Sequence, residues 1–214
     1  MQNRVTGTVV AKQSRKGNRE KLLNATLSLI LEDQSGLAGL SLRKITKQSE
    51  LSPPAFYNHF SSTEELGLAL VEEAGTVIRG LLKSVRDADS VEEVIGRSVE
   101  IAFDYITTHR ALFIFIARER AGSSAAIRQA IRLNVRAIIE DMSDDFATSG
   151  LFPQYDLDEL RAMVSAIVSL GLNLIPDLLD LTEAEPEEPD YLLREFEFQV
   201  RTMLKNGYKA EPIS

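Results

Sequence analysis

Residues 41–60, SLRKITKQSELSPPAFYNHF, constrain the fold more than any other part of the chain. Ser41 is a good N-cap, and Leu42 and Ile45 follow on one apolar stripe, which predicts a first helix of about two turns. Ser52 is a second N-cap, and the prolines after it suit a first helical turn, whose N–H groups have no partner within the helix. The segment therefore predicts two short helices separated by a tight turn.

The second of these helices has an apolar side and a polar side. Phe56 and Phe60 lie four residues apart and face inward with Leu51. The opposite, solvent-facing side then carries Pro53, Tyr57, Asn58 and His59. A polar face of this kind is what a helix that reads the major groove of DNA requires. The alternative is a packed aromatic residue beside a surface histidine, but the cap and the proline start favour DNA contact.

The remaining sequence has helical periodicity, without a strand pattern or an internal repeat. Residues 1–16 are polar and predict a mobile arm, and the acidic segment 182–190 predicts a loop. Seven further helices are expected, at residues 18–36, 63–86, 91–108, 111–119, 123–148, 156–181 and 191–206. We therefore predict an all-α fold of about nine helices. Residues 1–62 form an N-terminal arm and a DNA-binding domain, and residues 63–214 form a ligand-binding and dimerisation domain.

Charge is divided unevenly along the chain. Residues 1–63 hold nine Lys and Arg against four Asp and Glu, a net +5, so the remainder of a chain with net charge −8 carries −13. A basic N-terminal part on an acidic body is expected where only the former meets phosphates. Basic N-termini are also common elsewhere. Arg15 and Lys16 could contact DNA from the arm, or could simply be solvated.

Composition argues against several functions. The chain has no cysteine and only two histidines, so we expect no metal site. We found no G-x-S-x-G, Walker or H-E-x-x-H motif, and therefore expect neither an enzyme nor a cofactor. The N-terminus lacks the apolar region of a signal peptide, and no apolar run approaches the ~18 residues that span a membrane. These features predict a soluble, cytoplasmic protein without membrane insertion.

The motif SPPAFYNHF, the short helix before it and the EEL at the start of the next helix resemble the TetR family of transcriptional repressors. Two longer stretches, residues 40–60 with EELGLALVEEAG and later RERAGSSAAIRQAI, are similar to the FabR- and DesT-type repressors of unsaturated fatty acid synthesis. The resemblance implies a homodimeric repressor that binds a pseudo-palindromic double-stranded DNA operator. It also implies a hydrophobic effector, either a long-chain acyl-CoA or a fatty acid.

The same resemblance assigns DNA contacts to Ser41, Arg43, Ser52, Pro53, Pro54, Tyr57, Asn58, His59 and Thr63. Four positions depart from the family pattern. Thr63 stands where a phosphate-binding Lys is frequent, and Pro54 and Ala55 stand where hydroxyl residues are usual. Asn58 replaces an Arg of the fatty-acid repressors, and because Arg reads guanine whereas Asn prefers adenine, the operator sequence stays open.

The body holds an aromatic set that, on general grounds, is ordinary core. The resemblance implies instead that it lines a cavity for an acyl tail, with a cationic mouth for the phosphates of coenzyme A. The expected ligand-binding residues are Phe103, Tyr105, Ile106, Phe113, Ile116, Arg118, Arg120, Met142, Phe146, Met163 and Ile167. For the arginines, including Arg128, Arg132 and Arg136, a solvated or ion-paired face is an equal alternative. Glu119 is either a local ion-pair partner or a buried anchor.

The last two predicted helices are rich enough in apolar positions to face both their own core and a partner subunit, which predicts a four-helix dimer interface. The effector is then expected to shift the population of DNA-competent dimers. Two other interpretations stay open. One is a TetR-type repressor of an efflux or detoxification gene that answers a drug-like ligand, and the other is a helical lipid carrier that binds no DNA.

Overall fold

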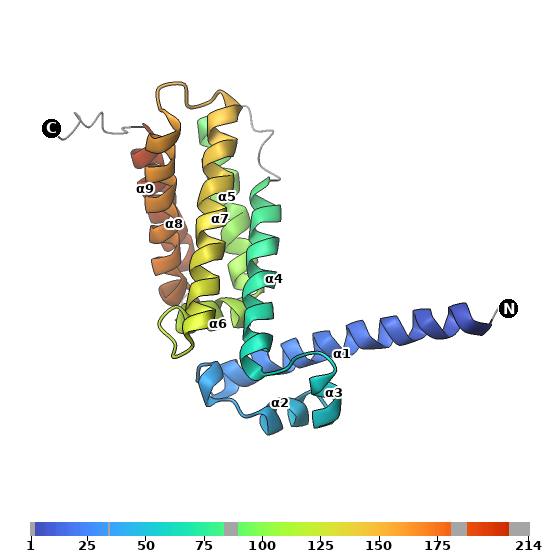
Figure 1. The fold of residues 1–214 in the computed structure, drawn as a ribbon. Helices are drawn as coiled ribbons and strands as arrows, with labels where there is room; N and C mark the ends of the chain where they lie inside the picture. Colours follow the sequence, from blue (N-terminus) through green and yellow to red (C-terminus); the bar gives the residue numbers. More distant parts are fainter. Residues whose placement is uncertain (1–2, 34, 84–89, 181–187, 206–214) are drawn as a thin grey trace. The chain divides into compact units, whose positions relative to one another are not determined.

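The computed structural model describes residues 3–33, 35–83, 90–180 and 188–205, with side chains for 16–33, 35–83, 90–179 and 191–204. In this part of the chain all regular structure is helical, which confirms the predicted all-α fold (Figure 1). The elements are α1 (Asn3–Asp33), η1 (Leu37–Gly39), α2 (Leu42–Gln48), α3 (Pro53–Tyr57), α4 (Thr63–Lys83), α5 (Val91–Thr108), α6 (Arg110–Glu119), α7 (Ala125–Ser149), α8 (Leu157–Asp180) and α9 (Glu188–Lys205).

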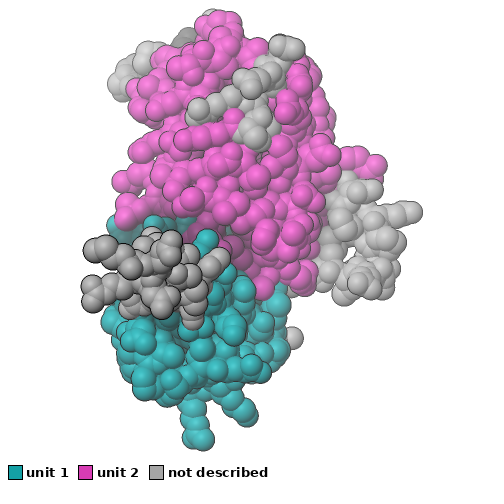
Figure 2. Space-filling view, turned by 90° about the vertical axis from the view of Figure 1, so that its right-hand side faces the viewer, with its two compact units in different colours: residues 1–72, 114–131 teal, residues 73–113, 132–214 magenta. Residues whose placement is uncertain are grey.

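Packing divides the chain into two compact units (Figure 2). Unit 1 comprises residues 1–72 and 114–131, and unit 2 comprises residues 73–113 and 132–214. Helices α4, α6 and α7 each contribute residues to both units. This division concerns packing, whereas the predicted boundary at 62/63 concerns function and stays a prediction.

Unit 1 is built on α1. Leu22 and Ile30 of this helix are completely buried, and so are Ile45 of α2 and Phe56 of α3. Helices of seven and five residues cannot be stable alone, because the first turn of a helix is costly and few bonds follow it. Helix α1 packs against α2, and α2 packs against α3. The predicted role of the first helix as an apolar floor is therefore confirmed for α2.

The prediction of an N-terminal arm was wrong, and the prediction of a loop at 182–190 was wrong for its last three residues. From Asn3 onward the predicted arm is the first half of α1, and no proline interrupts it. The predicted loop at 182–190 already becomes helical at Glu188, where the following proline suits a first turn. Residues 182–187 lie outside the described residues.

Unit 2 has a core in which α5, α8 and α9 meet. The buried members of this cluster are Ile95, Val99, Phe152, Leu160, Ile167, Val200 and Leu204. Tyr155, just before α8, donates from its hydroxyl to the backbone carbonyl of Leu204 at 3.1 Å. This bond ties the end of α9 to the segment that opens α8.

Helix α8 bears on the expectation that no apolar segment of this chain is long enough to span a membrane. Its segment Leu157–Leu179 is long and apolar enough, by length and composition, to cross a bilayer, and it is the one such helix among the described residues. One helix of this kind is weak evidence, because helices of soluble cores have the same composition. In this structure Leu160, Val164, Ile167 and Ile175 of α8 are buried.

Replacing Leu160 by Ala should lower the free energy of unfolding by about 2–5 kcal/mol, because the side chain is 1% exposed and its loss leaves a cavity. Leu133→Ala is the matched control, since Leu133 is 52% exposed on α7 and its truncation should cost less than ~1 kcal/mol. Urea unfolding at one fixed protein concentration measures both. Equal losses would contradict the assignment of the core.

Candidate DNA-binding and ligand-binding sites

The helix-turn-helix has the local structure that the sequence predicts. The Ser41 hydroxyl accepts from the Lys44 backbone N–H at 3.3 Å, and the Ser52 hydroxyl accepts from Ala55 at 3.4 Å. Between the helices, Glu50 has a φ of 56°. A side chain in this left-handed region is strained, and the turn tolerates it because the Leu51 N–H bonds to the Thr46 carbonyl at 3.0 Å.

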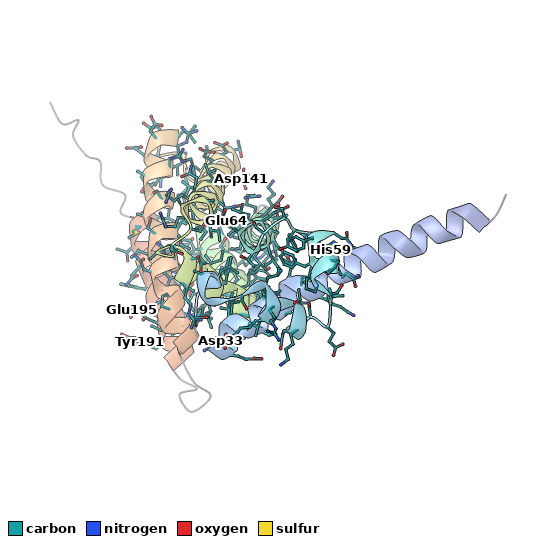
Figure 3. The ribbon with its side chains drawn as sticks, turned by 60° about the horizontal axis from the view of Figure 1, so that its bottom comes forward. Asp33, His59, Glu64, Asp141, Tyr191 and Glu195 are labelled. Atoms are coloured by element: carbon teal, nitrogen blue, oxygen red, sulfur yellow. The ribbon has the colours of Figure 1, made fainter. Side chains whose placement is uncertain are left out.

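The exposed face of α3 is polar and short. Tyr57 is 59% exposed, and its ring packs edge-on against buried Phe56 with the centroids 5.6 Å apart. Pro53 is exposed, and so is Asn58, which is the C-cap residue. His59 follows Asn58 in the turn after α3 and is partly buried (Figure 3). The face predicted for groove reading is thus present, with Asn58 and His59 just beyond the last helical residue.

The other predicted DNA contacts lie on the surface of unit 1. Ser41, Arg43, Ser52 and Pro54 are exposed, as is Lys16 on α1. Thr63 is the partly exposed first residue of α4, and the Arg15 side chain lies outside the described residues. Contact of all these residues with DNA stays a prediction.

Two basic residues near this face are engaged within the protein. Lys44 forms an ion pair with Asp33 at 2.8 Å, from α2 to the end of α1. The Arg19 guanidinium lies 5.5 Å from the centre of the Phe60 ring, a cation–π geometry. Arg43 is exposed at the start of α2 and is therefore the better candidate for a phosphate.

The start of α4 is capped from both sides. The Ser62 hydroxyl accepts from the Glu65 N–H at 3.0 Å, and the Glu65 carboxylate accepts from the Ser61 N–H at 2.6 Å. The hydrogen bonds from the Ser61 hydroxyl and N–H hold the pKa of Glu65 below its usual value. The serines and glutamates of SSTEEL predicted this helix start correctly.

Unit 2 contains an apolar cavity of about 170 Å³. Its walls come from α4, α5, α7, α8 and α9, with Phe113 as the contribution of α6. Ser98 and Tyr105 are the two hydroxyl-bearing residues of the wall. Burial, and then the negative charge of Glu73, raise the pKa of the Tyr105 hydroxyl. It therefore stays protonated and able to donate a hydrogen bond at neutral pH.

Seven of the eleven predicted ligand residues line this cavity: Phe103, Tyr105, Ile106, Phe113, Met142, Phe146 and Ile167. Met163 packs instead against the α5–α8–α9 core. Ile116, Arg118 and Arg120 belong to unit 1, where Arg118 donates to backbone carbonyls. Sequence reasoning missed wall residues without a chemical signal, such as Ala102 and Gly171. Only the packing of the helices shows that these small residues leave space.

The comparisons with known proteins agree with this architecture. Residues 22–76 match the profile described as bacterial regulatory proteins, tetR family, and residues 91–199 match the tetracyclin repressor-like C-terminal domain. An uncharacterised HTH-type transcriptional regulator of Haemophilus influenzae is 30% identical over 172 residues, which cover 79% of this chain and 82% of the relative.

Solved structures share the fold at low sequence identity. A Syntrophomonas wolfei protein assigned to the TetR family has a TM-score of 0.72 at 20% identity, covering 92% of this chain and 99% of its own. The fatty acid degradation regulator FadR of Bacillus halodurans has a TM-score of 0.70 at 17% identity, covering 91% and 97%. FadR of Bacillus subtilis, in complex with stearoyl-CoA, has a TM-score of 0.64 at 16% identity, covering 88% and 98%.

A capped helix-turn-helix followed by a larger helical body defines a class of transcriptional regulators that bind DNA. Within that class, the chain belongs to the TetR family of bacterial regulatory proteins. Regulators of this family bind operator DNA and form dimers.

Arg43→Gln should weaken operator binding and reduce the slope of log affinity against log salt by about 0.9 for each phosphate that the arginine no longer neutralises. Tyr57→Phe, which keeps the packing against Phe56, should weaken binding without changing that slope, since a neutral donor releases no counterion. Arg97→Gln on α5 is the control, because Arg97 lies in unit 2 and pairs with Glu93. Fluorescence anisotropy over a salt series measures all three. Unchanged operator binding in both Arg43→Gln and Tyr57→Phe would contradict the assignment of the DNA-binding face.

Proposed function

We propose that the protein is a cytoplasmic homodimeric repressor of the FabR and DesT type, which senses a long-chain acyl-CoA or fatty acid and controls unsaturated fatty acid synthesis genes. The observation that carries the proposal is the apolar cavity of unit 2, whose walls supply almost no polar partner. An acyl chain needs none, and each methylene removed from water contributes about 0.8 kcal/mol.

The size of the cavity supports a ligand-driven change of conformation. Its 170 Å³ is smaller than the ~300–1,000 Å³ of typical ligand pockets. A long acyl chain therefore needs the surrounding helices to move apart. A ligand that fits the expanded form better stabilises that form, and this difference in affinity shifts the population of DNA-competent dimers.

Two solved structures with this fold suggest which probes to use. One is a fatty acid degradation regulator, and another was solved with stearoyl-CoA. Their identities of 17% and 16% support the fold and not the ligand. Acyl-CoA thioesters of different saturation are therefore the first compounds to test, and the proposal leaves open which of them promotes repression.

The coenzyme A part of such a ligand needs cations at the cavity mouth. Arg118 is held by the carbonyls of Ile30 and Ser35, so it is poorly placed to bind phosphate as well. Arg136, which is exposed on the unit 2 part of α7, is the better candidate among the arginines considered.

Ala102→Phe should fill the cavity and abolish the thermal shift that oleoyl-CoA and stearoyl-CoA produce in the wild type. Ala126→Phe, at an exposed position of α7 in unit 1, is the matched control and should keep the shift. Differential scanning fluorimetry measures both. A full response in Ala102→Phe would place the ligand elsewhere, and no response of operator affinity to either thioester in the wild type would refute acyl sensing.

The dimer interface is proposed to lie on α8 and α9. Phe198 is 70% exposed and Tyr191 is 55% exposed, both on α9, and Leu157 of α8 is 36% exposed. Figure 3 shows Tyr191 and Glu195 along one side of α9. Exposed aromatic residues beside a well-packed core are typical of surfaces that a second subunit covers.

Phe198→Glu should convert the dimer to a monomer and weaken operator binding by at least about 100-fold, because a single helix-turn-helix contacts only one half-site of the operator. Leu133→Glu is the control, since Leu133 is 52% exposed on α7 and lies outside the proposed interface. Sedimentation velocity and anisotropy measure the two effects. A dimeric Phe198→Glu variant would exclude this residue from the interface.

A second candidate function is the repression of an efflux or detoxification gene in response to a cationic drug. The observation that favours it is the charge of Glu73 close enough to Tyr105 to raise the pKa of its hydroxyl. A negative charge that acts on an aromatic wall residue favours a cationic ligand over an anionic one. A fluorimetry panel that includes ethidium separates the candidates, since only the drug sensor should respond to it and lose that response in Glu73→Gln.

A further inference from the structure

The C-terminal end of α6 carries a buried carboxyl group that the proposed ligand site does not use. Glu119 is 3% exposed, and its Oε1 accepts from the backbone N–H of Leu37 at 2.8 Å. Leu37 opens η1, and the residue at the N-cap of η1, Gly36, has no side chain to cap it. Glu119 therefore supplies from a distant segment the cap that the local sequence lacks.

The preceding residue binds the neighbouring helix end. Arg118 donates from Nη1 to the carbonyl of Ile30 at 2.8 Å and to that of Ser35 at 3.3 Å. Ile30 lies in the last turn of α1, where carbonyls have no partner within the helix and a positive charge is favourable. Arg118 thus binds the C-terminal end of α1, and Glu119 binds the N-terminal end of η1, which follows α1 in the chain. We refer to these two residues as the clasp.

Two glycines leave room for the clasp. A Cβ at position 36 would lie 2.7 Å from Oε1 of Glu119, and a Cβ at position 122 would lie 2.3 Å from its Oε2. Ordinary side chains at either position would displace the carboxyl group. The absence of a side chain at Gly36 and Gly122 therefore leaves room for the Glu119 carboxylate in this position. Of the two alternatives that the sequence left open, Glu119 is the buried anchor and not a surface ion-pair partner.

The clasp acts on the segment that enters the DNA-binding helices. The end of α1 and η1 come directly before Ser41, the N-cap of α2. All of these residues belong to unit 1 together with the clasp. A second bond in the same unit, from the Ser124 hydroxyl to Glu64 Oε1 at 2.6 Å, joins the start of α7 to the first turn of α4, where Figure 3 labels Glu64.

The helix that carries the clasp also reaches the proposed ligand site. Phe113, which lines the cavity, lies on α6 six residues before Glu119, less than about two helical turns away. We infer that Arg118 and Glu119 are positioning residues that hold the base of the helix-turn-helix to α6, and that the ligand changes operator affinity through this attachment. The second part of this inference rests on the proposed ligand-responsive function.

The test uses the full-length dimer, operator DNA selected from a random pool by the wild type, and oleoyl-CoA as the probe. Glu119→Ala removes the acceptor, whereas Glu119→Gln keeps an oxygen for the Leu37 N–H. Glu159→Ala is the matched control, because Glu159 also caps a backbone N–H, that of Asp156 at 2.9 Å, but lies in unit 2.

In Glu119→Ala, amide hydrogen exchange over residues 36–48 should accelerate by at least about tenfold, since the buried N–H of Leu37 loses its partner. Operator affinity should fall by about tenfold or more, and the affinity for oleoyl-CoA should change by less than about twofold. The ratio of operator affinities with and without oleoyl-CoA should approach one. A general loss of stability would leave that ratio unchanged, so the ratio distinguishes positioning from plain destabilisation.

Glu119→Gln should restore exchange, operator affinity and the ratio to within about threefold of the wild type. If Glu119→Ala does not fold, Gly36→Ala displaces the same carboxyl without deleting it and should give the same pattern. Unchanged exchange at residues 36–48, or equal effects in Glu159→Ala, would overturn the inference. If oleoyl-CoA does not change operator affinity in the wild type, the proposed acyl sensing is refuted. Hydrogen exchange and operator affinity in the Glu119 variants still test whether the clasp positions the helix-turn-helix.

Discussion

The DNA-binding part of this protein depends on the burial of a few apolar side chains from helices too short to exist alone. Helix α3 has five residues and α2 has seven, yet Phe56 and Ile45 are fully buried in the same unit as α1. Because the backbone bonds within these helices are few, their position is decided by what surrounds them. The cap that Glu119 gives to η1 and the contact of Arg118 with the end of α1 belong to those surroundings.

The candidate DNA-binding face and the candidate ligand cavity belong to different compact units. They share no residue, but α4, α6 and α7 each contribute to both units. A protein that converts ligand binding into a change of DNA affinity needs at least one structural element whose conformational equilibrium is shifted by both sites. Among the shared helices, α6 carries a wall residue of the cavity and, less than two turns later, the buried Glu119.

Local features of the fold could be predicted where a residue acts on its own neighbours. Ser41 and Ser52 cap their helices, and Val91–Thr108 is the helix that the periodicity predicts. Residues 3–16 were mispredicted because polar, glycine-bearing sequence is compatible with both coil and helix. Arg118 and Arg120 were expected at the mouth of the ligand cavity, but they lie in unit 1. The sequence could not show this, because helical periodicity indicates which residues share a face of a helix and not which other helices that face contacts.

The sequence by itself determined the helix-turn-helix, the all-α class and the family, since caps, helical spacing and the SPPAFYNHF motif are local and readable along the chain. Tertiary structure alone decided which apolar residues enclose space and what role Glu119 has. A cavity is the volume that packed helices fail to fill, and a side chain such as Ala102 borders it only through neighbours distant in the sequence. The bond from Leu37 to Glu119 likewise joins residues 82 positions apart, and no local pattern encodes such a contact.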